Sequence, residues 1–141
     1  MNNYFQEEKG MIKKVYDFLK QAKVFFVSTE EGAEPKVRPF GFVMIYEEKL
    51  YFCTNNQKSV YRQLQENPNV EICACVGTEW IRVKGRAVFD KSLEAKKQVF
   101  VSDPGMSALY KPEDEIFEVF YLENGSAAFC SMDGKSQTVN F

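Results

Sequence analysis

The amino-acid sequence predicts a mainly β protein, a closed or partly closed antiparallel β-barrel with a few helices. Six or seven segments combine apolar alternation with flanking turn residues, and most of them are joined by short turns. The few helical segments do not alternate regularly with the strands, as they would in a doubly wound parallel sheet. Short strands joined in this way are typical of small antiparallel barrels.

The first half of the chain supplies a helix and three strands. Apolar residues recur at three- and four-residue steps from Met11 to Ala22, which predicts an amphipathic helix. A strand at Val24–Thr29 ends in a turn at residues 30–33. A second strand, Lys36–Tyr46, then forms a hairpin with a third, Lys49–Thr54, through Glu47 and Glu48.

The second half adds two helices and the remaining strands. Val60, Tyr61 and Leu64 form the apolar side of a short helix that stops at Asn67-Pro68. Ser92 is expected to cap a third helix, Leu93–Val101, which ends at Asp103-Pro104-Gly105. The strands expected here are Val70–Val76, Glu79–Asp90, Ile116–Leu122, Ser126–Ser131 and Gln137–Phe141, with turns at Asn124-Gly125 and Asp133-Gly134.

Length and composition predict one domain, residues 1–141, because neither a flexible linker nor an internal repeat interrupts the chain. The longest apolar runs are far shorter than the roughly 20 residues needed to cross a bilayer. The polar N-terminus lacks the pattern of a secretory signal. We therefore expect a cytoplasmic protein that does not associate with membranes.

Charge and residue types exclude several classes of function. The net charge of −2 argues against a nucleic-acid-binding surface. The chain has no histidine, which removes serine–histidine triads, cysteine–histidine pairs and histidine metal sites. Its four cysteines contain no C-x-x-C pair, so we expect no metal site and interpret them as reduced thiols buried in a core. A bound organic cofactor would then be the economical way to carry out chemistry.

A phosphate site is predicted where the third strand ends and the short helix begins. The segment from Cys53 to Ser59 leaves backbone N–H groups free at a helix start, which favours an anion. Thr54, Asn55 and Ser59 add hydrogen-bond donors. Lys58 adds a cation at a helix N-terminus, where the helix dipole disfavours a positive charge unless an anion is bound. The alternative is ordinary capping by Asn56 beside a solvated lysine.

Two further segments have the chemistry of a ligand site. In Arg38–Phe42, Pro39 places the strand at an edge or rim, and Gly41 removes a side chain where a flat ligand could lie. In the fifth strand, Trp80, Arg82, Lys84 and Arg86 share one face. Each segment has a simpler interpretation as a solvent-facing strand. Together with the phosphate site, they suit a phosphorylated aromatic cofactor.

The order of these features resembles the pyridoxamine 5′-phosphate oxidase-like flavoproteins, especially their short nitroimidazole-reductase-like members. The resemblance covers most of the chain. It depends on four motifs, which are Arg38-Pro39, Phe-Cys-Thr-Asn before Lys58-Ser59, Trp80-x-Arg82-x-x-Gly85, and Ala128-Phe-Cys-Ser131. A Trp and an Arg near the C-terminus of the true oxidases have no match here, so we do not expect a role in making pyridoxal phosphate.

The resemblance implies a split barrel of the FMN-binding type and a two-fold homodimer with FMN at its interface. Arg38 and Lys58 would contact the FMN phosphate, helped by Thr54, Asn55 and Ser59. The backbone of Arg38, Pro39, Phe40, Gly41 and Phe42 would border the isoalloxazine ring. Trp80 and Arg82 would line the cofactor pocket, and Cys53 lies within a matched motif.

The function expected from this resemblance is an FMN-dependent oxidoreductase acting on a small aromatic or nitro compound. A transiently bound nicotinamide or a partner protein would supply the electrons, and no residue stands out as an acid–base catalyst. Three alternatives remain open. The barrel could store or sense flavin without turnover. It could hold a deazaflavin or a haem in place of FMN, although the lack of histidine counts against haem. It could also be a ligand-free dimer that meets a partner through its fifth-strand cations.

Overall fold

The computed structural model describes residues 2–141, with side chains from Lys9 onward. Its helices are α1 (Asn2–Ala22), α2 (Ser59–Glu66), α3 (Leu93–Ser102) and the short 3₁₀ helix η1 (Pro104–Ala108). Its strands are β1 (Phe25–Glu31), β2 (Glu34–Phe40), β3 (Met44–Tyr46), β4 (Lys49–Asn55), β5 (Asn69–Val76), β6 (Glu79–Asp90), β7 (Phe117–Ser131) and β8 (Ser136–Asn140).

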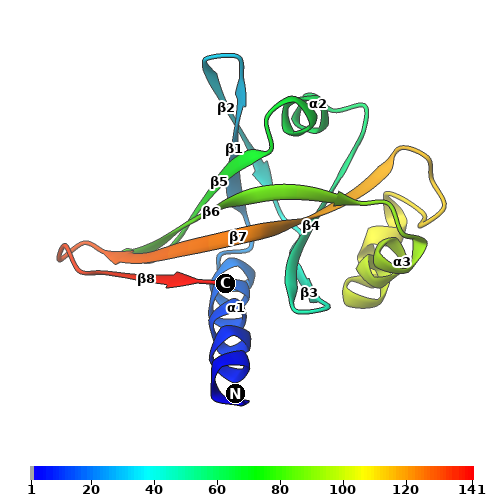
Figure 1. The fold of residues 1–141 in the computed structure, drawn as a ribbon. Helices are drawn as coiled ribbons and strands as arrows, with labels where there is room; N and C mark the ends of the chain where they lie inside the picture. The colour runs from blue at the N-terminus through cyan, green and yellow to red at the C-terminus, as the bar shows by residue number, and fades with distance from the viewer. Residues whose placement is uncertain (1) are drawn as a thin grey trace.

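One antiparallel sheet contains all eight strands, in the order β2-β1-β5-β6-β7-β4-β3, with β8 paired to β7. The long strand β7 crosses the molecule and pairs with β6 along most of its length (Figure 1). Its first half also pairs with β4 and its second half with β8. This change of neighbour opens the barrel on one side, so the predicted split antiparallel barrel is confirmed.

The core forms two clusters on the sheet, and the larger one is covered by α1 together with Val60 and Leu64 of α2. Ile12, Val15 and Leu19 of α1 pack into the larger cluster, where the Phe52 ring lies 5.7 Å from Phe25 and 5.5 Å from Phe120 between centroids. A second cluster forms where α3 covers β3, β4 and β7. Because each helix contributes one apolar face, the sheet is covered at two separate places.

The predicted second strand, Lys36–Tyr46, is wrong as a single element. β2 ends at Phe40 and β3 begins at Met44, with Gly41, Phe42 and Val43 between them. β2 pairs with β1, whereas β3 pairs with β4 at the other end of the sheet order, so the chain must leave one ladder before it joins the next. This crossing segment becomes one wall of the site.

The predicted turn at Asn124-Gly125 is also wrong, because β7 continues through it. The ladder shifts here by one residue opposite Gly85, which makes a β-bulge. Asn124 has a positive φ of 53°, and a Cβ on Gly125 would collide with the ring of Phe141. Asn can adopt a positive φ in a bulge as well as in a hairpin turn, so the dipeptide alone does not distinguish them.

The predicted cap of α3 is confirmed. Ser92 occupies the N-cap position, and its side-chain oxygen accepts a hydrogen bond from the backbone N–H of Ala95. Replacing Ser92 by alanine should lower the free energy of unfolding by about 1 kcal/mol, whereas Ser92→Asp should retain it. Urea unfolding of the two variants measures this difference, and equal stability would show that the cap contributes nothing.

Candidate cofactor-binding site

A pocket of about 290 Å³ opens where the crossing segment after β2 meets the junction of β4 and α2. Most of the residues predicted from the sequence line it, namely Arg38, Pro39, Phe40, Gly41, Phe42, Cys53, Thr54 and Lys58. These residues come from two parts of the chain that are separated in sequence by β3. The fold therefore brings the first two predicted segments together.

The start of α2 has the features of an anion site. Lys58 occupies the N-cap position and makes no side-chain capping bond, so no side chain satisfies the first backbone N–H groups of the helix. Thr54 is 4% exposed, and its hydroxyl is a buried polar atom without a hydrogen-bond partner within the structure. An orphaned hydroxyl, an uncapped helix start and a lysine around one pocket suit a phosphate group.

Capping by Asn56, the simpler interpretation, is wrong. The Asn56 side-chain amide instead donates to the carbonyl of Glu115 and to Glu118 Oε1, over 2.8 and 3.1 Å. Glu118 is buried and also accepts a 2.6 Å hydrogen bond from Lys91. Asn56 thus fixes the loop before α2 to β7 and leaves the helix start open.

The opposite wall of the pocket comes from the end of α3 and from η1. Asp103, Met106, Leu109 and Tyr110 line it, and none of them was singled out in the sequence. Asn55 does not line the pocket, but its side-chain amide donates to the Tyr110 hydroxyl over 2.7 Å. Asn55 therefore acts at this site by holding Tyr110, while Ser59 is exposed as the first residue of α2.

Burial raises the pKa of the Cys53 thiol to about 12, although the nearby charge of Lys58 partly opposes this effect. The thiol is therefore protonated at neutral pH and is a poor nucleophile. Cys53 forms part of the pocket wall without the reactivity of a thiolate.

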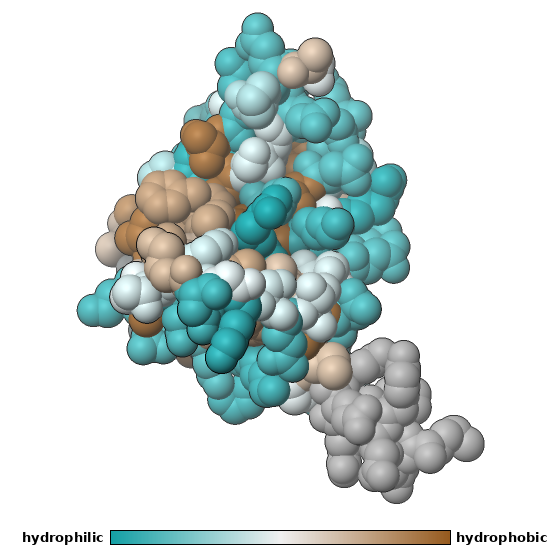
Figure 2. Space-filling view, turned by 90° about the vertical axis from the view of Figure 1, so that its left-hand side faces the viewer, coloured by the Kyte–Doolittle hydropathy of each residue, from teal (hydrophilic) through white to brown (hydrophobic). Residues whose placement is uncertain are grey.

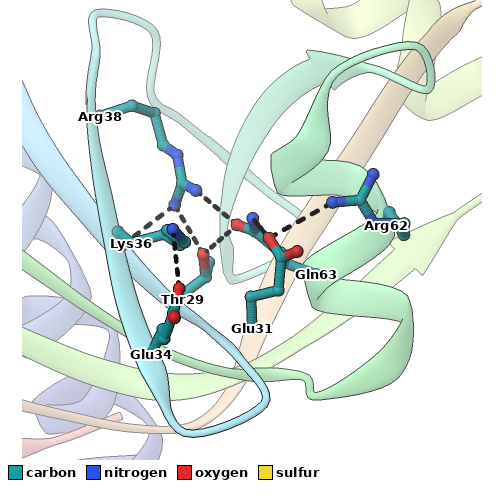
Figure 3. Close-up of polar contacts among 7 residues, drawn as sticks. All are labelled: Thr29, Glu31, Glu34, Lys36, Arg38, Arg62 and Gln63. Carbon is teal, nitrogen blue, oxygen red and sulfur yellow. Dashed lines mark hydrogen bonds and ion pairs between the residues drawn. The ribbon is translucent and has the colours of Figure 1, made fainter.

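Arg38 lies between the pocket and a hydrogen-bond network that reaches α2 (Figure 3). Its Nη1 donates to the carbonyl of Val27 and to the Thr29 hydroxyl, over 3.1 and 2.7 Å. Its Nη2 donates to Gln63 Oε1 over 2.5 Å. Burial lowers the pKa of Arg38 from its usual high value. Both terminal nitrogens of the guanidinium group thus bind protein atoms.

Trp80 and Arg82 do not line this pocket. As predicted, they share one face of β6, where Arg82 pairs with Glu71 over 2.7 Å and Trp80 lines a separate hollow with Phe18 and Phe129.

Cys73 and Cys75 lie on the same outer face of the sheet and are exposed, so the expectation that they are buried is wrong. Alternation along β5 buries Val70, Ile72 and Ala74 instead.

A larger hollow, of about 480 Å³, lies on the sheet beside the bulge and is lined by Thr29, Lys84, Gly85 and Asn124 among others. Within the described residues, it contains no buried polar atom without a partner. The described residues also hold no cluster of three metal-ligating side chains. No helix among them is long and apolar enough to span a membrane.

The sequence and the fold are both similar to those of known proteins. Residues 11–128 match the family described as pyridoxamine 5′-phosphate oxidase. A NimC/NimA family protein from Clostridium acetobutylicum is 38% identical, with a TM-score of 0.88 over 92% of this chain and 91% of that one. No protein of curated function matches the sequence.

Two more distant structures share the fold. General Stress Protein 26 from Bacillus anthracis is 17% identical, with a TM-score of 0.72 over 90% of this chain and 97% of that one. A pyridoxamine 5′-phosphate oxidase-related, FMN-binding protein from Nostoc punctiforme is 15% identical, with a TM-score of 0.61 over 94% and 95%. With most of its length matched, the chain belongs to the pyridoxamine 5′-phosphate oxidase family of split-barrel proteins.

Proposed function

We propose that the protein binds FMN in the pocket between β2, β4, α2 and η1. The observation that carries this proposal is the buried hydroxyl of Thr54, which has no partner and lies in the same pocket as Lys58. The phosphate would bind at this end, where it would receive the helix N–H groups and the lysine ammonium group. The ring would lie against the backbone of Pro39, Phe40 and Gly41.

We further propose oxidoreductase activity on a small aromatic or nitro compound. Bound FMN would supply the hydride or electron transfer, while the protein orients the ring and excludes water. Met106 and Leu109 offer an apolar wall for an aromatic substrate. The Tyr110 hydroxyl accepts its hydrogen bond from Asn55, so its own proton is left to donate into the pocket.

A reductive titration tests the activity. Under anaerobic conditions, NADH or NADPH should bleach the long-wavelength band of the bound flavin, and a nitroaromatic compound should restore it. If neither nicotinamide bleaches the band, dithionite can reduce the flavin and the nitroaromatic step can be followed alone. Flavin that stays reduced in the presence of the nitro compound would favour a binding or sensing role instead.

We also propose that the protein is a homodimer whose interface includes the outer face of the sheet. The strand register aligns Phe26, Cys73, Arg82 and Ala128 across β1, β5, β6 and β7. Phe26 is 49% exposed and Val37 on β2 is 66% exposed. Brown and tan side chains also gather at the surface between hydrophilic regions in Figure 2. Exposed apolar area of this kind is typical of a protein interface.

Light scattering should therefore give about twice the 16.3 kDa chain mass. Phe26→Glu should reduce the mass to that of one chain, because it places a charge in the proposed contact. The Gln65→Glu variant, altered at an exposed position of α2, should remain dimeric. A wild-type mass of one chain would contradict the proposal. In such a dimer, the FMN pocket would lie at the interface, and Trp80 and Arg82 would line it as the family resemblance implies.

A further inference from the structure

Gln63 is a buried amide in the middle of α2 whose polar atoms all point to other elements. It is 2% exposed. Its Oε1 accepts hydrogen bonds from the Thr29 hydroxyl and from Arg38 Nη2, over 2.6 and 2.5 Å. Its Nε2 donates to Glu31 Oε2 over 2.8 Å. A single side chain of α2 is thus tied to three residues of β1 and β2 (Figure 3).

This connection bears directly on the pocket, because α2 carries two of its lining residues, Lys58 at the N-cap and Val60 in the first turn. Gln63 follows within the next turn of the same short helix. Because α2 is only eight residues long, hydrogen bonds that fix its middle also limit how far its N-terminal N–H groups can shift. The buried side chains of Val60 and Leu64 hold α2 by apolar contact, which is not directional.

The same contacts set what Arg38 can do. Three of its hydrogen bonds of 3.1 Å or less end on Val27, Thr29 and Gln63. Binding a phosphate through both terminal nitrogens would require Nη1 to leave its two acceptors, so Arg38 has its Nε–H and the second N–H of Nη2 to offer a ligand. Turning Nη2 away from Gln63 would leave the buried oxygen of Gln63 with one donor fewer, which costs free energy in a buried site.

We propose that Gln63 is a positioning residue for the phosphate site, and that Arg38 holds Gln63 in place for this role. This inference rests on the proposed function and adds a residue to it. Glu31 Oε2 accepts the hydrogen bond from the Nε2 group of Gln63. Arg62, on the surface, contacts the same carboxylate oxygen at 3.3 Å. The hydrogen bond from Gln63, with Arg62 and Lys36 nearby, lowers the pKa of Glu31, so the acceptor is charged at neutral pH.

The test compares FMN with riboflavin, which lacks the phosphate, in fluorescence titrations of wild type and Gln63→Met. The methionine keeps the length of the side chain but removes the acceptor and the donor. We expect FMN affinity to fall roughly tenfold, which corresponds to the loss of one hydrogen bond to a charged group. Riboflavin affinity should stay within about twofold. Gln65→Met, the same change at an exposed position of α2, should alter neither.

The ratio of the two affinities separates positioning from general stability, since a looser fold would weaken both flavins in proportion. The double variant Glu31→Gln/Gln63→Glu exchanges the two side chains. Position 63 then still accepts from Arg38, and position 31 donates to position 63. The ratio of FMN to riboflavin affinity should therefore return toward that of wild type. If Gln63→Met does not fold, Gln63→Asn, which withdraws the amide by one methylene, serves the same comparison. An unchanged ratio in a folded variant would overturn this inference alone. A wild type that binds neither flavin would overturn the proposed function and this inference with it.

Discussion

Lys58→Ala is expected to weaken FMN binding roughly ten- to a hundredfold and to leave riboflavin binding almost unchanged. A hydrogen bond to a charged group contributes about 1.5–3 kcal/mol, and each 1.4 kcal/mol corresponds to a factor of ten in affinity. Lys58 occupies the N-cap of α2, where a cation opposes the helix dipole unless an anion is bound. The ligand-free variant should therefore be at least as stable as wild type.

Fluorescence titration with both flavins, at low and at physiological salt, measures the effect of Lys58. The difference between wild type and variant should shrink as salt screens the charge. Lys97→Ala, which removes an exposed lysine from α3, is the matched control and should bind FMN as wild type does. Equal FMN affinity in wild type and Lys58→Ala would mean that the phosphate does not bind at the start of α2.

Thr54→Val is expected to change stability and binding in opposite directions. The buried Thr54 hydroxyl has no partner in the protein, so replacing it by a methyl group of similar shape removes a desolvation cost. The free energy of unfolding of the ligand-free protein should rise by about 1 kcal/mol, while FMN affinity should fall roughly tenfold because the phosphate loses a hydrogen-bond donor. Urea unfolding without ligand and an FMN titration measure the two effects.

Thr29→Val is the matched control for Thr54→Val, since it makes the same change at a threonine that is also buried. The Thr29 hydroxyl accepts from Arg38 and donates to Gln63, so its loss should lower the free energy of unfolding by about 1–3 kcal/mol. Similar destabilisation by both variants would mean that the Thr54 hydroxyl serves the fold. It would not then be reserved for a ligand.

Sequence patterns predicted the parts of the structure that depend on neighbouring residues. The bounds of β6 follow from alternation over Glu79–Asp90, and the Ser92 cap lies directly before the helix it caps. The same holds at the site for Thr54 and Lys58, because a strand end followed by a helix start is a local feature. Local chemistry therefore predicted one side of the pocket.

The remaining parts depend on contacts between distant residues, which no local pattern reports. Tyr110 reaches the pocket through a hydrogen bond to Asn55, 55 positions away, and Gln63 meets Arg38 across 25 positions. The exposure of Cys73 depends on which face of β5 meets the core. Trp80 belongs to one of the four sequence motifs that predicted the site. In the fold of a single chain, however, it lies outside the pocket that the other motif residues line.

The pocket between β2, β4, α2 and η1 is proposed to hold a phosphorylated flavin. The most direct measurement is the visible absorbance spectrum of the purified protein before and after FMN is added, with riboflavin added in parallel. We expect paired flavin bands that are shifted from those of free FMN, saturate at one FMN per chain and require the phosphate for tight binding. A featureless spectrum to which added FMN contributes only the bands of the free cofactor would contradict it.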